Sequence, residues 1–142
     1  MYKIEKTSYG TCVTFSGIVT EEEMRRFKAE SELIPAGTSG PRAAMADIRD
    51  LLPPDQIVRD LLIEALRGAW TTGLLRVAVI GKSPVIKRQT IQLVFQAGGV
   101  DTMRYFDASK LPDWEKHALD WLIHGVEPED TTNPGTARIQ IG

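Results

Sequence analysis

The feature that most constrains the fold is an alternation of strand and helix patterns between residues 75 and 122. A nearly uninterrupted apolar run, Leu75–Ile80, precedes a helical pattern that begins at Ser83-Pro84 and ends at Gly98-Gly99. Thr102–Phe106 then fits a second strand, and Asp113–Leu122 fits a second helix. An apolar run without polar alternation is typical of a strand that is covered on both faces. The alternation therefore predicts an α/β fold with parallel strands.

The amino-terminal residues predict a hairpin followed by a helix. Tyr2–Lys6 and Thr11–Ser16 alternate in polarity on either side of a turn, which indicates two antiparallel strands. Thr20 and Glu23 have the spacing of a capping box, in which each side chain bonds the backbone N–H of the other residue. The helix that begins there is expected to end near Pro35.

The middle of the chain predicts one more strand and one more helix. Arg42–Ile48 is a run of small and apolar residues, which indicates a buried strand with Asp47 at its carboxyl end. Pro53-Pro54-Asp55 precedes a helical pattern that ends near Gly73. The sequence thus predicts a single-domain mixed β-sheet of about five strands with four helices and an N-terminal antiparallel hairpin. It leaves the order of the strands open.

The α/β domain is expected to span residues 1–124, with residues 125–142 as a C-terminal tail. The tail begins with a stretch rich in Pro, Glu and Thr that resembles flexible coil. Arg138–Ile141 alternates in polarity and predicts a brief strand.

Composition narrows the classes of protein that this chain can belong to. Its 142 residues are 42% hydrophobic and 25% charged, which is ordinary for a globular protein. A net charge of −2 supplies no basic field for nucleic acid, so no nucleic-acid partner is expected. No apolar stretch is long enough to span a membrane, and a cytoplasmic location is expected. Cys12 lies in an apolar run and is interpreted as a core residue.

Several of these patterns together resemble a known family. They are Ala46–Arg49, Arg76–Ile80, Arg104–Asp107, Asp113-Trp114 and Trp121-Leu122, together with the hairpin and the capping box. In this combination the chain resembles the SpoIIAA-like proteins of the STAS superfamily over about residues 2–124. The resemblance implies a small βα sandwich that serves protein association or ligand sensing rather than a known catalytic activity.

The chain departs from that family at the regulatory serine. Anti-sigma-factor antagonists of the family carry a phosphorylatable Ser at the start of the helix after the third strand. Here Arg49–Asp55 occupies that region and contains neither Ser nor Thr. The departure argues against a partner switch controlled by a kinase at this position.

The start of the helix at Ser83 is a candidate anion site. Lys82, Ser83, Lys87 and Arg88 gather there, and a helix N-terminus offers free N–H groups and a positive dipole end. A phosphate, a carboxylate or an acidic partner would relieve the repulsion between these cations and the dipole. The simpler interpretation is a cap and a turn. A phosphate-binding P-loop is excluded because Arg76 stands where its first glycine is required.

Asp47 and Asp107 are weaker candidates at strand ends. Both are expected at the carboxyl ends of strands, where open α/β sheets bind ligands. Paired carboxylates could perform acid–base chemistry or hold a metal, but strand-end aspartates often only cap the following turn. His117 and His124 lie about 10 Å apart along one helix and cannot share a metal ion. No metal site, cofactor or catalytic residue is assigned.

Trp114 and Trp121 share an apolar stripe on the last predicted helix. The simpler interpretation is packing within the molecule. If the stripe is wider than the sheet can cover, its exposed part is a candidate dimer face or the mouth of an apolar ligand site.

Three hypotheses about function follow. The first is a non-enzymatic regulatory or protein-interaction module of SpoIIAA-like type, acting as a homodimer or with an unidentified protein partner. The second is a carrier or sensor of a small apolar or amphipathic anion, whose body lies between helices and whose head lies near Lys82 and Arg88. The third is an uncharacterised enzyme that uses Asp47 or Asp107.

Overall fold

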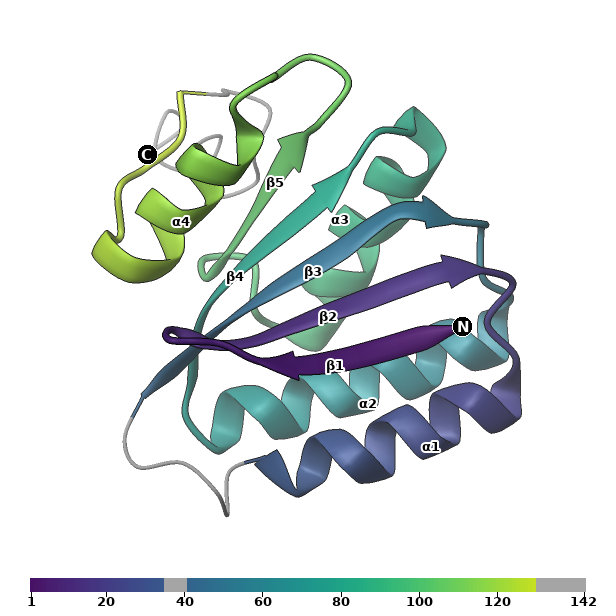
Figure 1. Ribbon diagram of the computed structural model, residues 1–142. Helices are drawn as coiled ribbons and strands as arrows, with labels where there is room; N and C mark the ends of the chain where they lie inside the picture. The colour runs from purple at the N-terminus through teal and green to yellow at the C-terminus, as the bar shows by residue number, and fades with distance from the viewer. Residues whose placement is uncertain (35–40, 130–142) are drawn as a thin grey trace.

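The structure is a computed structural model that describes residues 1–34 and 41–129. Within these residues the strands are β1 (Tyr2–Lys6), β2 (Gly10–Gly17), β3 (Arg42–Leu51), β4 (Leu74–Gly81) and β5 (Met103–Asp107). They form one sheet in the order β1-β2-β3-β4-β5 (Figure 1). β1 and β2 pair antiparallel, and all other neighbours pair parallel. The predicted α/β fold with a mixed sheet and an N-terminal hairpin is confirmed.

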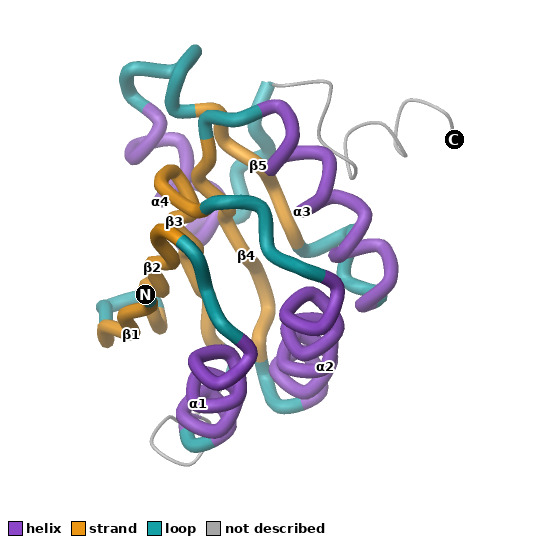
Figure 2. Tube along the Cα trace, turned by 90° about the vertical axis from the view of Figure 1, so that its right-hand side faces the viewer, coloured by secondary structure: helices purple, strands orange, loops and turns teal. Residues whose placement is uncertain are grey.

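The helices lie in two layers. They are α1 (Glu21–Glu32), α2 (Gln56–Thr71), α3 (Pro84–Ala97) and α4 (Trp114–His124). α1, α2 and α3 cover one face of the sheet, and α4 packs on the other face over β3, β4 and β5 (Figures 1 and 2). The first three helices each connect neighbouring parallel strands, and crossovers of one hand place their helices on the same face.

The helix ends follow the signals in the sequence. Thr20 and Glu23 form the predicted capping box at α1. Asp55 caps α2 by accepting from Val58 N at 3.0 Å. Ser83 accepts from Ile86 N at 3.4 Å, so the predicted cap of α3 is confirmed. Local hydrogen bonds therefore set where each of these helices begins.

β4 is buried on both faces, as its apolar run predicts. Val77 and Val79 belong to the core under α1, α2 and α3. Ala78 and Ile80 alternate with them and belong to the core under α4. This strand therefore holds the two layers of helices together.

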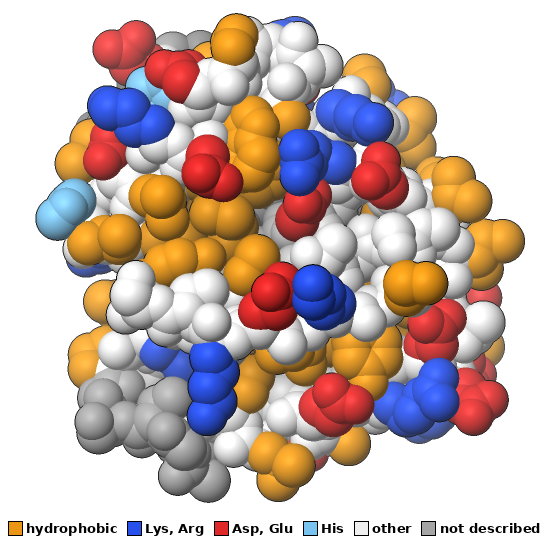
Figure 3. All heavy atoms as spheres, viewed as in Figure 1, with side chains coloured by type: hydrophobic (Ala, Val, Ile, Leu, Met, Phe, Trp, Pro, Cys, Tyr) orange, Lys and Arg blue, Asp and Glu red, His pale blue; other side chains and the backbone are white. Residues whose placement is uncertain are grey.

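Two expectations about β2 and β3 need correction. β3 does not end at Asp47 but continues to Leu51, because Asp50 and Leu51 still pair with Ser16 and Gly17 of β2. Cys12 is half-buried rather than a full core residue, since α4 lies mainly over β3, β4 and β5. Figure 3 shows this face, where apolar side chains gather beside α4 and charged groups surround them.

The predicted strand at Arg138–Ile141 lies outside the described residues. Just after the predicted boundary at residue 124, the chain still contacts the body of the domain: Val126 N donates to Asp120 O at 3.1 Å, and Glu127 pairs with Arg104. No helix among the described residues is both long enough and apolar enough to cross a bilayer.

Candidate functional site

An apolar cavity of about 100 Å³ lies between α2, α3 and the sheet. Aliphatic side chains of α2 and α3 form its helical wall, and β3 and β4 form its floor. The apolar lining includes Val58, Leu62, Leu66, Ile86, Leu93, Ala46 and Val79. We call this space the α2–α3 cavity. This set of apolar side chains is what an apolar ligand would need around it.

Trp70 and Gln89, which line this cavity, each carry a buried polar atom. Neither Trp70 Nε1 nor Gln89 Oε1 has a hydrogen-bond partner within residues 1–34 and 41–129. The hydroxyl of Thr90, which also lines the cavity, is already bonded to Ile86 O at 2.8 Å. Because a buried polar group without a partner costs free energy, the two atoms call for an explanation.

The position of Trp70 depends on Gly99. A Cβ atom at Gly99 would lie 2.0 Å from two ring carbons of Trp70, so the indole packs directly against the glycine backbone. This close approach joins the end of α2 to the turn that follows α3. It also fixes the position of the indole, which lines the α2–α3 cavity.

Among the residues that the structure describes, Arg59 is the one charged residue that lines the cavity. Its guanidinium donates to Pro54 O at 2.7 Å and to Gln56 Oε1 at 2.8 Å. These bonds hold the charge near the start of α2. Trp70 lies eleven residues further along the same helix, about 16 Å along its axis. The charged and the indole-lined parts of the cavity are therefore well separated.

The predicted basic cluster does not line the cavity. Lys82 forms an exposed ion pair with Asp50 at 3.4 Å, and Ser83 caps α3. The Lys87 ammonium lies 5.3 Å from the centroid of the Tyr105 ring, and Arg88 is exposed. The structure thus separates these four residues from the cavity, and anion binding by them stays a prediction.

Lys87 instead borders a second hollow of about 350 Å³, on the side of β5. Tyr105, Asp107, Lys110 and His117 also line it. Burial, and to a lesser degree the nearby carboxylate of Asp107, raises the pKa of Tyr105 to about 12. The phenol is therefore protonated at neutral pH. Cations and carboxylates are mixed in this hollow, so it presents no field of a single sign.

The two strand-end acids do not form a pair. Asp47 lies on β3 and Asp107 on β5, and β4 runs between them through Ile80 and Gly81. Two strand spacings amount to about 10 Å, too far for carboxylates to share a proton. Burial raises the pKa of Asp47, but hydrogen bonds from the Arg49 side chain and backbone outweigh it and lower the pKa overall.

Asp107 is occupied with local structure as well. Its carboxylate accepts from the backbone N of Ser109 at 2.9 Å and from the Ser109 hydroxyl. Among the residues that the structure describes, no three His, Cys, Asp or Glu side chains converge as metal ligands would. The two aspartates therefore act here as local hydrogen-bond acceptors of turns and neighbouring side chains.

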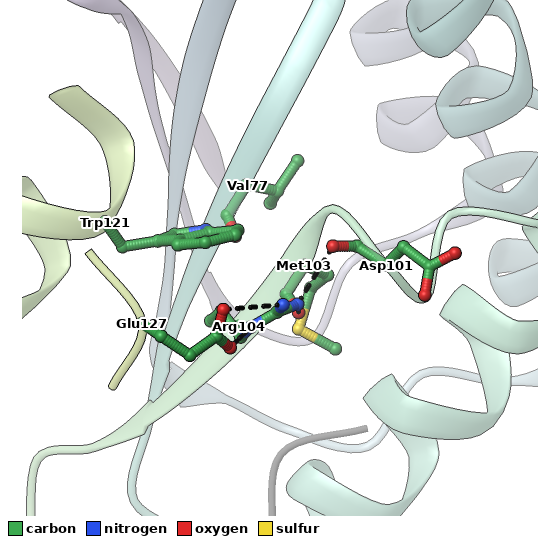
Figure 4. Close-up of polar contacts among 6 residues, drawn as sticks. All are labelled: Val77, Asp101, Met103, Arg104, Trp121 and Glu127. Atoms are coloured by element: carbon green, nitrogen blue, oxygen red, sulfur yellow. Dashed lines mark hydrogen bonds and ion pairs between the residues drawn. The ribbon is translucent and has the colours of Figure 1, made fainter. Parts of the chain in front are cut away.

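Trp121 and Trp114 differ in their surroundings. Trp121 is buried, and its indole N–H donates to Val77 O at 3.1 Å. The Arg104 guanidinium lies 4.3 Å from the centroid of its ring and also pairs with Glu127 (Figure 4). Trp114 is half-buried beneath the guanidinium of Arg49, 4.7 Å from the ring centroid. The stripe is thus largely used for packing within the molecule.

Sequence reasoning missed Gln89 and Arg104. Gln89 stands between Ile86 and Leu93 at helical spacing, so a polar residue on the apolar face of α3 was the available signal. Arg104 lies inside a buried strand, where an unpaired charge would be costly. Its partner Glu127 is distant in sequence, and no spacing rule connects the two.

Comparison with known proteins bears on the fold. No protein-family profile and no curated protein matches the chain. A crystal structure of an uncharacterised DUF3478-family protein with a SpoIIAA-like fold, from Shewanella loihica PV-4, is similar with a TM-score of 0.62. The sequences are 22% identical, and the match covers 86% of this chain and 92% of the other. The SpoIIAA-like fold that the sequence resembles is therefore present.

Proposed function

We propose that this protein is a non-enzymatic module that carries or senses a small, mostly apolar molecule in the α2–α3 cavity. The observation that carries the proposal is the cavity of about 100 Å³ with its apolar lining. Native interiors are close-packed, and an engineered apolar cavity of about 150 Å³ binds benzene. A SpoIIAA-like fold fits a regulatory or interaction role, and a bound ligand would supply the signal for such a role.

Native mass spectrometry of protein purified from cells tests the proposal. The expected spectrum contains a species heavier than the chain, whose extra mass is lost on denaturation. Ala46→Leu should reduce this species because Ala46 lines the cavity. Ala29→Leu is the matched control, since Ala29 is exposed on α1. An absence of retained mass, together with no rise in melting temperature when benzene is added, would contradict ligand carriage.

A second candidate function is association of two copies of the chain. Ile18 is 72% exposed, Leu52 is 52% exposed and Ile57 is 51% exposed. These side chains lie at the carboxyl edge of the parallel strands, and a hydrogen bond of 3.1 Å from Leu52 N to Gly17 O joins two of the loops that carry them. Exposed aliphatic side chains that gather at one edge favour a protein contact.

Sedimentation at micromolar concentration tests this association. A homodimer is expected to dissociate in Ile18→Asp, because a charge would enter an apolar contact. Leu33→Asp is the matched control, since Leu33 is 71% exposed at the end of α1. A monomer at all concentrations, or equal effects of the two variants, would remove the support for a dimer through this edge.

A further inference from the structure

We infer that the molecule held in the α2–α3 cavity is neutral and that its polar group is a hydroxyl, bonded by Trp70 Nε1–H or Gln89 Oε1. The inference rests on the proposed function, since it concerns the same cavity. It differs from the amphipathic anion expected from the sequence, whose head would lie near Lys82 and Arg88.

The lining of the cavity argues against a charged ligand. Burying a charge without a partner is far more costly than burying a neutral polar group. Arg59 contributes a cation to the lining, but its guanidinium already donates to Pro54 O and Gln56 Oε1. A carboxylate near Trp70 would lie about 16 Å along α2 from that cation. The part of the cavity near Trp70 therefore suits a neutral molecule.

The two unpartnered atoms specify the polar group. The indole of Trp70 can only donate a hydrogen bond, and Gln89 Oε1 can only accept one. A hydroxyl both donates and accepts, so it can bond whichever of the two atoms it reaches. A hydrocarbon would leave both atoms unsatisfied. A neutral alcohol or phenol therefore fits the lining better than a hydrocarbon of the same size.

A matched set of small probes tests the inference. Benzene, phenol and benzoate share the same ring. Benzene has no polar group, phenol has a hydroxyl and benzoate has a carboxylate. Calorimetric titration of the full chain is expected to show phenol binding about tenfold more tightly than benzene, as one added hydrogen bond allows. Benzoate is expected to bind more weakly than phenol. In two-dimensional NMR, phenol should shift an indole N–H signal that Trp70→Phe removes, or the Gln89 side-chain signals.

Variants identify the atoms that bond the hydroxyl. Trp70→Phe with Gln89→Leu should abolish the preference for phenol over benzene and retain benzene binding, because both substitutions keep an apolar lining. Gln92→Leu is the control for the second change, since Gln92 is exposed on the same helix. Melting temperatures of all variants check that each one folds.

The outcomes separate this inference from the proposed function. Equal affinity for benzene and phenol, a preference that survives the double variant, or tightest binding by benzoate would overturn the neutral hydroxyl while ligand carriage stands. If none of the three probes binds and the native protein retains no mass, both the inference and ligand carriage fail.

Discussion

At the scale of single residues, Gly99 controls the wall of the cavity. Gly99→Ala would place a methyl group 2.0 Å from ring carbons of Trp70, so the indole must move. We expect the free energy of unfolding to fall by about 1–3 kcal/mol, as overpacked interiors do. Denaturant unfolding measures the loss, and tryptophan fluorescence reports the displaced indole.

Gly68→Ala is the matched control for this prediction. Gly68 lies inside α2, and a Cβ atom there would meet nothing within 4 Å. Alanine should stabilise the helix by about 0.5–1 kcal/mol, because glycine loses more backbone freedom on folding. If both variants change the free energy of unfolding in the same direction, the contact between Gly99 and Trp70 does not determine the effect of Gly99→Ala.

Tyr105 gives the protein a pH dependence in the alkaline range. Burial raises its pKa to about 12, whereas an unfolded tyrosine titrates near pH 10. Between these values the unfolded chain loses the proton and the folded chain keeps it. The free energy of unfolding is unaffected by this group below about pH 10. It falls by up to roughly 3 kcal/mol as the pH rises to about 12 and beyond. The free energy of unfolding of Tyr105→Phe, measured across this pH range, should fall less steeply than that of the wild type.

At the scale of elements, helix starts were predictable because neighbouring residues determine them. Thr20, Asp55 and Ser83 each bond a backbone N–H three residues later. The end of β3 was not predictable in this way. Its last residues are held by pairing with Gly17, more than thirty positions earlier, and nothing in the local sequence at Leu51 records that pairing.

The segment after α4 should contribute to stability through Glu127. Arg104 is buried, and Glu127 supplies the carboxylate that faces its guanidinium. The free energy of unfolding is expected to be about 1–3 kcal/mol lower for a chain that ends after Gly125 than for one that ends after Glu129. Glu127→Gln in the longer chain should reproduce most of the loss. Equal stability of all three chains would show that the ion pair contributes nothing.

At the scale of the whole molecule, the cavity could not be predicted from sequence. It depends on which side chains of α2 and α3 meet over the sheet, and that follows from the strand order that sequence left open. The basic cluster at Ser83 lies at the start of α3, as the sequence predicts, yet none of its residues lines the α2–α3 cavity. Sequence patterns located the elements but not the surfaces that they share.

The cavity should make the protein sensitive to pressure. Internal voids vanish on unfolding, so they make the volume change of unfolding more negative. Ala46→Leu fills part of the α2–α3 cavity and should reduce the magnitude of this volume change by on the order of 20 mL/mol. Pressure unfolding followed by fluorescence measures it, with Ala29→Leu as the control. If neither variant alters the volume change of unfolding, the α2–α3 cavity is already filled in the protein.

The order of the sheet has a consequence for how the chain folds while it is being made. Each strand pairs with the strand synthesised just before it, from β1 through β5. A nascent chain can therefore add one strand and one helix at a time to a sheet that already exists outside the ribosome. No early strand has to wait for a distant one, and the edge at which the sheet grows is covered at each stage by the next segment.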